Sequence, residues 1–277
     1  MKKMLSLALV LVLMMSLAAC GAKTETPAAT TAPAAAAETT AAAADTEAPA
    51  AEVKTIEAGK LIMSTNASFP PYEMIADDGS FEGIDIEVAD AIAKKLGLEL
   101  EVDDMDFDAA LLAVQQNKSD IVMAGVTVTD DRKLVMNFTD SYATGVQVVI
   151  VKEGSDVTLD NLGEKMIGTQ RGTTGYIYTS DDYGDDHVTA YDNGASAVQA
   201  LQNGQVDCVV IDAAPAEAYV EANPGLTILD TEYVTENYAI GVNKDNAALL
   251  DAINGALAEL TADGTLDTII GKYITAE

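Results

Sequence analysis

From Lys60 onwards the chain alternates short apolar runs with longer segments in which apolar residues recur every three to four positions. The short runs have the length of buried strands, and the longer segments have the period of amphipathic helices. Strands are predicted at Leu61–Thr65, Leu98–Val102, Asp120–Ala124, Lys165–Gln170 and Tyr238–Val242. This alternation favours an α/β fold with a largely parallel, doubly wound sheet.

The helical segments carry their own start and stop signals. A helix whose buried face includes Ile86 and Ile92 is expected to end at Gly97. Asp106 is expected to cap the next helix, which should bury Leu111, Leu112 and Val114. Two more helices, one with Leu249, Leu250, Ile253 and Leu257 and one over Leu266–Tyr273, are separated by the stop signal Asp263-Gly264.

A weak internal repeat links two helix–strand units. Residues 110–125 read ALLAVQQNKSDIVMAG, and residues 197–212 read AVQALQNGQVDCVVID, so that Gly125 aligns with Asp212. The repeat is too distant and too singular for a solenoid and predicts two similar α/β lobes. Chance similarity between two amphipathic units is the alternative.

Two lobes require the chain to cross between them twice. The crossings are expected near Gly145–Val148 and Glu236–Ile240, as a two-segment hinge. The predicted first lobe therefore spans residues 56–146 and 239–277, and the predicted second lobe spans residues 147–238.

The N-terminal segment differs in composition from the rest. Two lysines precede an apolar run and the sequence Leu-Ala-Ala-Cys-Gly at residues 17–21, which resembles the bacterial lipobox. Residues 1–19 are therefore predicted to be a lipoprotein signal peptide, with lipid attached to Cys20; an ordinary signal peptide with an incidental cysteine is the alternative. Residues 20–55, rich in Ala, Thr and Pro, are predicted to form a disordered tether.

Charge and cysteine content narrow the possible functions. A net charge of -30 repels nucleic acid and anionic lipid surfaces, so nucleic-acid binding is excluded. Two distant cysteines and one histidine argue against a disulfide framework and a His/Cys metal site. No metal and no cofactor are expected, and any chemistry must use carboxylates, hydroxyls and the backbone.

Residues 124–132, AGVTVTDDR, suggest a site for a small zwitterion. Thr129 can cap a short helix that carries Arg132, whose guanidinium can bind a carboxylate in a bidentate way. A capped turn with a surface arginine explains the same residues. The repeat adds Asp212 at the corresponding strand end, and a cation and an anion across one cleft suit the carboxylate and ammonium of an amino acid.

Other segments supply candidates around this pair. The stretch Gln170–Gly175, QRGTTG, offers hydroxyl and amide donors, although as a lone motif it is more often a turn. Phe69 and Phe107 are interpreted as walls for a ligand side chain, and Tyr72 as core. The acidic residues Asp103, Asp104 and Asp106 are interpreted as a solvated loop rather than a metal site.

The region from about Lys60 to Tyr273 resembles the polar amino-acid substrate-binding proteins of bacterial ABC transporters, which have the type II periplasmic-binding-protein fold. The motifs that carry this resemblance are FPPYE at residues 69–73, FEGIDIEV at residues 81–88, AGVTVTDDR, GTTG at residues 172–175 and DGTL at residues 263–266.

The resemblance implies a role for each candidate. Arg132 would bind the ligand carboxylate with the backbone amides of Thr127 and Thr174. Asp212 would hold the ammonium with the Gly125 carbonyl and the Thr127 hydroxyl. The side chain would meet Asn66, Phe69 and Phe107, with Gln170 nearby. Where relatives that bind cationic or amide side chains often carry aspartate, this chain has Asn66, which favours a neutral polar ligand unless Asp103, Asp104 or Glu73 supplies the charge.

The expected function is capture of an L-amino acid between two closing lobes and its delivery to an ABC permease driven by cytoplasmic ATPases. The protein is expected to be a monomer, held by its lipid anchor alone on the outer face of the cytoplasmic membrane of a Gram-positive-type cell. It is expected not to be an enzyme, because His187 lies in a polar loop away from the strand ends. A dehydratase-like enzyme on the same scaffold and a surface sensor or adhesin are the alternatives.

Overall fold

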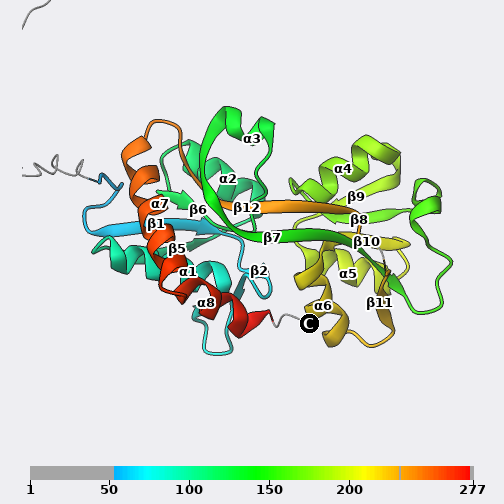
Figure 1. The fold of residues 1–277 in the computed structure, drawn as a ribbon. Helices are drawn as coiled ribbons and strands as arrows, with labels where there is room; N and C mark the ends of the chain where they lie inside the picture. Colours follow the sequence, from blue (N-terminus) through cyan, green and yellow to red (C-terminus); the bar gives the residue numbers. More distant parts are fainter. Residues whose placement is uncertain (1–52, 231, 275–277) are drawn as a thin grey trace, which may run out of the picture. The chain divides into compact units, whose positions relative to one another are not determined.

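The computed structural model describes residues 53–230 and 232–274 (Figure 1). The predicted signal peptide, Cys20 and most of the predicted tether lie outside these residues. The described residues belong to one compact unit. In the described part of the chain, no helix is both long and apolar enough to cross a membrane.

The elements follow the predicted alternation of strands and helices. The strands are β1 Lys60–Thr65, β2 Ser68–Phe69, β3 Glu73–Ile75, β4 Phe81–Glu82, β5 Glu99–Asp104, β6 Ile121–Val122, β7 Met136–Lys152, β8 Ile167–Gln170, β9 Val188–Tyr191, β10 Cys208–Asp212, β11 Leu226–Ile228 and β12 Val234–Asn243. The α-helices are α1 Ile84–Lys95, α2 Phe107–Gln115, α3 Asp130–Val135, α4 Thr174–Tyr183, α5 Gly194–Gln202, α6 Ala213–Ala222, α7 Ala247–Ala262 and α8 Thr265–Tyr273. Two 3₁₀ helices, η1 and η2, span Leu159–Glu164 and Asp185–His187.

One sheet runs through the whole unit, in the order β5-β1-β6-β12-β7-β10-β8-β9, with β11 paired to β7. Figure 1 shows β7 and β12 running side by side from one group of helices to the other. Pairing is parallel among β5, β1 and β6 at one end and among β10, β8 and β9 at the other. The remaining pairings are antiparallel, and each involves β7 or β12. The α/β fold is confirmed, but the sheet is parallel only towards its two ends.

Two regions of hydrophobic core lie at opposite ends of this sheet. Buried residues between 61 and 142 and between 238 and 269 form one region, while buried residues between 148 and 226 form the other. We call these regions, with the elements that cover them, the first and second lobe. The chain passes between them within β7 and within β12, where both predicted crossings fall. The exact lobe boundaries stay a prediction.

The two units of the internal repeat have a similar environment. In the first lobe Asp120 precedes β6, and its Oδ2 accepts a hydrogen bond of 2.9 Å from the backbone of Ile62 in β1. In the second lobe Asp207 precedes β10, and its Oδ2 accepts one of 2.8 Å from the backbone of Met166, just before β8. Each aspartate therefore joins its strand to the parallel neighbour.

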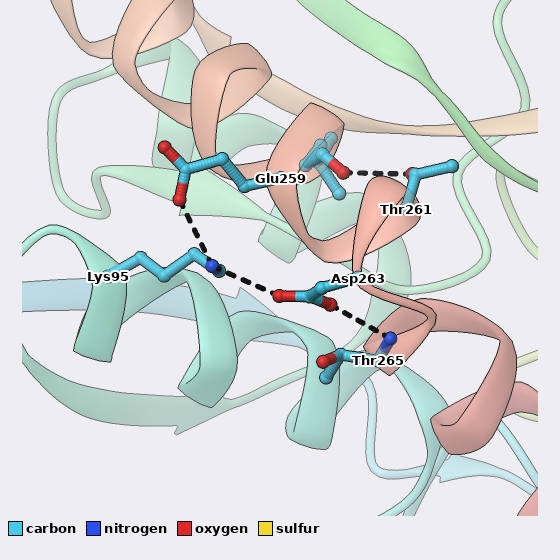
Figure 2. A network of polar contacts seen from close by, with 6 residues as sticks. Lys95, Glu259, Thr261, Asp263 and Thr265 are labelled. Atoms are coloured by element: carbon cyan, nitrogen blue, oxygen red, sulfur yellow. Dashed lines mark hydrogen bonds and ion pairs between the residues drawn. The ribbon is translucent and has the colours of Figure 1, made fainter.

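The C-terminal helices are fastened to α1 by a small polar network (Figure 2). Lys95 Nζ lies 3.0 Å from Glu259 Oε2 and 3.4 Å from Asp263 Oδ2. Asp263 also accepts a hydrogen bond of 3.0 Å from the Thr265 backbone, at the turn where the stop signal is predicted. Because these carboxylates are largely exposed, water screens the ion pairs and they add little to stability.

The prediction for α2 was wrong for Leu112, which is 47% exposed. Val114 is buried as predicted, Leu111 is partly buried, and the fully buried face consists of Phe107, Ala110, Ala113 and Val114. The helix begins at Phe107, whose ring is buried, and this contact sets the rotation of the helix. Asp106 occupies the N-cap position without a capping hydrogen bond from its side chain. Asp103 and Asp104 end strand β5 instead of forming a loop.

Candidate functional site

A pocket lies between the two lobes and encloses about 440 Å³ of empty space, including solvent at its mouth. All nine residues predicted to bind ligand line it: Asn66, Phe69, Phe107, Gly125, Thr127, Arg132, Gln170, Thr174 and Asp212. Seven further residues complete the lining: Glu73, Ala124, Gln147, Thr173, Val210, Ile211 and Tyr238. The structure brings the candidates together, and their contact with a ligand stays a prediction.

Arg132 is held by the local structure of AGVTVTDDR. The Thr129 hydroxyl accepts a hydrogen bond from the Arg132 backbone and caps α3. Arg132 is only 8% exposed; its Nη1 donates to the Thr127 carbonyl at 2.8 Å, and its Nη2 donates to the Gly172 carbonyl at 3.1 Å. It also lies 5.4 Å from the centroid of the Phe107 ring. The same segment therefore caps helix α3 and places a cation in the pocket.

The N-terminus of α4 adds donors on the second lobe. Thr173 caps this helix by accepting a hydrogen bond from the Tyr176 backbone. The Thr174 hydroxyl donates to Glu236 Oε2 at 3.0 Å and lies 3.4 Å from the Thr127 hydroxyl. A helix N-terminus beside a guanidinium is suited to a carboxylate, because both supply N–H donors and positive potential.

Asp212 ends β10 and begins α6. Its side chain is 2% exposed; Oδ1 accepts a hydrogen bond from the Ala214 backbone at 3.2 Å, as a helix cap. Oδ2 accepts bonds from the Val146 backbone at 2.9 Å and the Tyr238 hydroxyl at 2.8 Å. Burial raises the pKa of this carboxyl to about 6. A ligand ammonium beside it would favour the ionised form.

Two glycines allow close packing around these groups. Gly125 has φ +55°, and a Cβ there would lie 2.9 Å from Phe69 Cε1. A Cβ on Gly145 would lie 2.5 Å from Asp212 Oδ2 and would overlap the Tyr238 hydroxyl. Glycine is therefore required at both places for the aromatic rings to approach the pocket.

Aromatic residues form part of the wall. Phe69 stacks on Tyr72 with ring centroids 5.8 Å apart. Tyr72 is 2% exposed and belongs to the core of the first lobe, as predicted. Phe69 and Phe107 line the pocket from β2 and from the start of α2.

Asn66 and Gln170 join the lobes directly. Gln170 Nε2 donates to Asn66 Oδ1 at 2.9 Å, and Asn66 Nδ2 donates to the Met105 carbonyl at 2.9 Å. The amide of Asn66 is thus oriented by protein groups on both sides.

Four polar lining residues lay outside the nine predicted: Glu73, Gln147, Thr173 and Tyr238, of which Thr173 belongs to the QRGTTG stretch. Gln147 is found only through strand pairing, because it lies opposite Asp212 in the β7–β10 register. Tyr238 reaches the pocket from the crossing strand β12. Glu73 had a visible signal, since it ends the FPPYE motif and is one of the acidic residues that could supply charge in place of Asn66.

His187 lies away from the pocket, in η2, where its Nδ1 is 3.3 Å from the Lys165 carbonyl oxygen. The pocket lining contains no histidine, lysine or cysteine. Across residues 53–230 and 232–274, no group of three or more His, Cys, Asp or Glu residues is arranged to hold a metal ion.

Residues 61–276 match the bacterial extracellular solute-binding proteins, family 3. The chain belongs to this family. This solute-binding protein is 34% identical over 222 residues to a probable histidine-binding protein of Neisseria gonorrhoeae, covering 78% of the chain and 83% of the relative. It is 32% identical over 221 residues to ABC transporter arginine-binding protein 1 of Escherichia coli, covering 78% of the chain and 91% of the relative.

A solved structure of an ancestral arginine-binding protein bound to glutamine is similar to this solute-binding protein, with a TM-score of 0.75 and 40% identity. The match covers 79% of this chain and 99% of that one. The fold is therefore the type II periplasmic-binding-protein fold predicted from the motifs.

Proposed function

We propose that this protein is the extracytoplasmic substrate-binding component of an ABC importer and that it captures a polar L-amino acid. The observation that carries the proposal is the pairing of opposite charges in one pocket between the lobes. Arg132 and the N-terminus of α4 suit the ligand carboxylate, and Asp212 suits the ammonium. A relative named as an ABC transporter protein supports the link to import.

The ligand bridges the lobes and stabilises their closed arrangement. The closed protein then presents the amino acid to a membrane permease that is driven by cytoplasmic ATPases. A lipid on Cys20 and the tether over residues 20–55 hold the protein, as a monomer, at the outer face of the membrane.

The protein is a binding protein rather than an enzyme. The pocket acids Glu73 and Asp212 lie in a lining without histidine, lysine or cysteine, and Asp212 is committed to three hydrogen bonds from the protein. Catalysis of proton transfer needs a group that is free to exchange a proton with the substrate. The named relatives are also binding proteins.

Calorimetric titration of the purified protein, stripped of co-purified ligand, tests the proposal with a panel of L-amino acids. At least one polar amino acid should bind, and its D-enantiomer should bind far more weakly, because the charged groups have fixed positions. Failure of every member to bind would refute the proposal.

Arg132→Ala should abolish binding of every amino acid, because the carboxylate loses its bidentate partner. Arg171→Ala is the matched control, since Arg171 is exposed and does not line the pocket. If Arg132→Ala retained the affinity of the unchanged protein, the assignment of the carboxylate would be wrong.

A further inference from the structure

Glu236 is a buried acid just behind the pocket. It belongs to β12, is only 4% exposed and does not line the pocket itself. The next residues of β12 run beside the segment AGVTVTDDR. The Val128 backbone donates to the Asn237 carbonyl at 3.0 Å, and an isolated antiparallel bridge pairs Thr127 with Tyr238. These backbone contacts place Glu236 beside the part of the pocket that contains the predicted carboxylate-binding groups.

One oxygen of Glu236 joins two residues that do line the pocket. Gln147 Nε2 and the Thr174 hydroxyl each donate to Glu236 Oε2, at 3.0 Å in both cases. Gln147 lies on the other crossing strand, β7, and Thr174 is the first residue of α4 on the second lobe. In the β7–β12 register Glu236 is opposite Gly145, so Gln147 is its diagonal neighbour on the same face. The carboxyl group therefore fastens the N-terminus of α4 to both crossing strands.

The bond from Thr174 to Glu236 sets the direction of a short hydrogen-bond chain. A threonine hydroxyl has one proton to donate and two lone pairs that can accept. The proton of Thr174 is used at Glu236, so Thr127 is the donor in the 3.4 Å contact between the hydroxyls of Thr127 and Thr174. Both hydroxyl protons therefore point along the chain towards Glu236.

A chain with this direction suits one end of a zwitterion. With its proton directed at Thr174, the Thr127 hydroxyl can only accept hydrogen bonds from a ligand in the pocket. An ammonium group donates hydrogen bonds and accepts none. A carboxylate accepts only, so it has to be bound by the N–H groups of Arg132 and of the α4 N-terminus. The direction of the chain thus keeps the two charged groups of an amino acid apart.

We propose that Glu236 is a positioning residue for the amino-acid end of the ligand. By accepting hydrogen bonds from Gln147 and Thr174, it holds the N-terminus of α4 in place and makes the Thr127 hydroxyl an acceptor for the ammonium. This proposal rests on the proposed function, because it concerns the same pocket. Glu236 does not touch the ligand. Since every amino acid has the same two charged groups, Glu236 affects the binding of all of them equally.

Glu236→Ala removes the acceptor and leaves two donors without a partner. For every amino acid that binds, the dissociation constant measured by calorimetry should rise by about tenfold or more, and by a similar factor for each. Glu236→Gln is the conservative rescue. Its amide oxygen can accept both hydrogen bonds, and its NH₂ group takes the place of Oε1, which accepts no hydrogen bond within residues 53–230 and 232–274. Its dissociation constants should stay within about threefold of those of the unchanged protein.

Asn243→Ala is the matched control for the loss of a buried polar side chain. Asn243 lies in the same strand, is 6% exposed and donates to the carbonyls of Val114 and Gln115 at 2.9 and 3.0 Å. It does not line the pocket. Asn243→Ala should lower the stability towards urea and leave the affinities unchanged. A loss of affinity in Glu236→Ala alone is therefore not explained by lower stability.

Thr174→Val tests the hydrogen-bond chain without removing an acid. It replaces the hydroxyl by a methyl group and keeps the backbone N–H at the start of α4. Affinity should fall by about tenfold. Because Thr174 and Glu236 share one contact, the double variant with Glu236→Ala should lose little more than either single variant. Circular dichroism shows which variants are folded, and if Glu236→Ala is not, Thr174→Val alone decides the test.

The outcomes separate the two proposals. Unchanged affinity in folded Glu236→Ala or in Thr174→Val refutes the role of Glu236 and leaves the proposed function standing. A loss in Glu236→Gln as large as that in Glu236→Ala refutes it too, because the acceptor would then not be what matters. Losses that multiply in the double variant count against it in the same way. If no amino acid binds the unchanged protein, both proposals fail.

Discussion

The substitution Asp212→Asn tests whether the buried, ionised side chain of Asp212 destabilises the ligand-free protein. Burial raises the pKa of Asp212 from 3.8 to about 6, so the ionised side chain destabilises the ligand-free fold by roughly 3 kcal/mol at neutral pH. The sign is that of an acid whose pKa is higher in the folded state. The destabilisation is fully present above about pH 6, decreases as the pH falls, and is absent below the unfolded pKa of 3.8.

As the pH falls from about 7 to about 5, protonation of Asp212 should raise the free energy of unfolding by about 1.3 kcal/mol. Asparagine does not titrate, so Asp212→Asn should gain about 1.3 kcal/mol less than the unchanged protein over that interval. Asp85 and the exposed carboxylates contribute equally to both proteins and cancel in the comparison. The variant should also bind amino acids at least 30-fold more weakly, because the ammonium loses its anionic partner.

Urea denaturation of ligand-free protein, followed by circular dichroism at several pH values, measures both free energies. The amide that Asp212→Asn introduces cannot accept hydrogen bonds from both Val146 and Ala214, so the variant should lose about 1 kcal/mol at every pH from one unmade bond. Because this loss is the same at every pH, it does not change how the free energy of unfolding depends on pH. If the free energy of unfolding depended on pH equally in the two proteins, ionisation of Asp212 would not destabilise the fold, and the reasoning would be refuted.

Two further substitutions probe the packing where the lobes meet, and a third, at Gly255, serves as a control. Gly145→Ala should lower the free energy of unfolding by about 1 to 3 kcal/mol, because the new Cβ overlaps the Tyr238 hydroxyl. Gly255→Ala, at an open helical position, should raise the free energy of unfolding by about 0.5 to 1 kcal/mol. Urea denaturation distinguishes the two signs. Tyr219→Phe removes the 2.7 Å hydrogen bond that the hydroxyl of α6 donates to the Ser68 carbonyl on the other lobe. Its affinity for each amino acid, measured by calorimetry, should fall about fivefold, and unchanged affinity would show that this contact does not stabilise closure.

Much of the fold could be predicted because the pattern of apolar residues reports burial directly. The strand predicted at Leu61–Thr65 and the C-terminal helices agree with β1, α7 and α8 to within a few residues. The 17-residue strand β7 was not anticipated beyond its crossing at Gly145–Val148. Its first half faces one lobe and its second half the other, so its burial changes along its length and no single period describes it.

The lining of the pocket was predictable to a similar degree, and for a different reason, while contact of these residues with a ligand stays a prediction. Arg132, Thr174 and Asp212 occur where a strand meets a helix, and such junctions can be located along a sequence. Gln147 occurs in the middle of a strand and reaches the pocket only because β7 pairs with β10. A residue whose role depends on pairing across distant strands has no local signal.

The strand pair β7–β12 has a consequence for how binding can evolve. Its register shifts between Tyr238 and Ala239 and again between Ala239 and Gly241, close to where β12 enters the first lobe. Bulged pairs bend and twist more readily than regular ladders. A substitution at these shifts would alter the ratio of open to closed protein and would scale the affinity for every amino acid by one common factor. Substitutions in the pocket would alter the affinities relative to one another, so binding strength and selectivity can be adjusted independently in this protein.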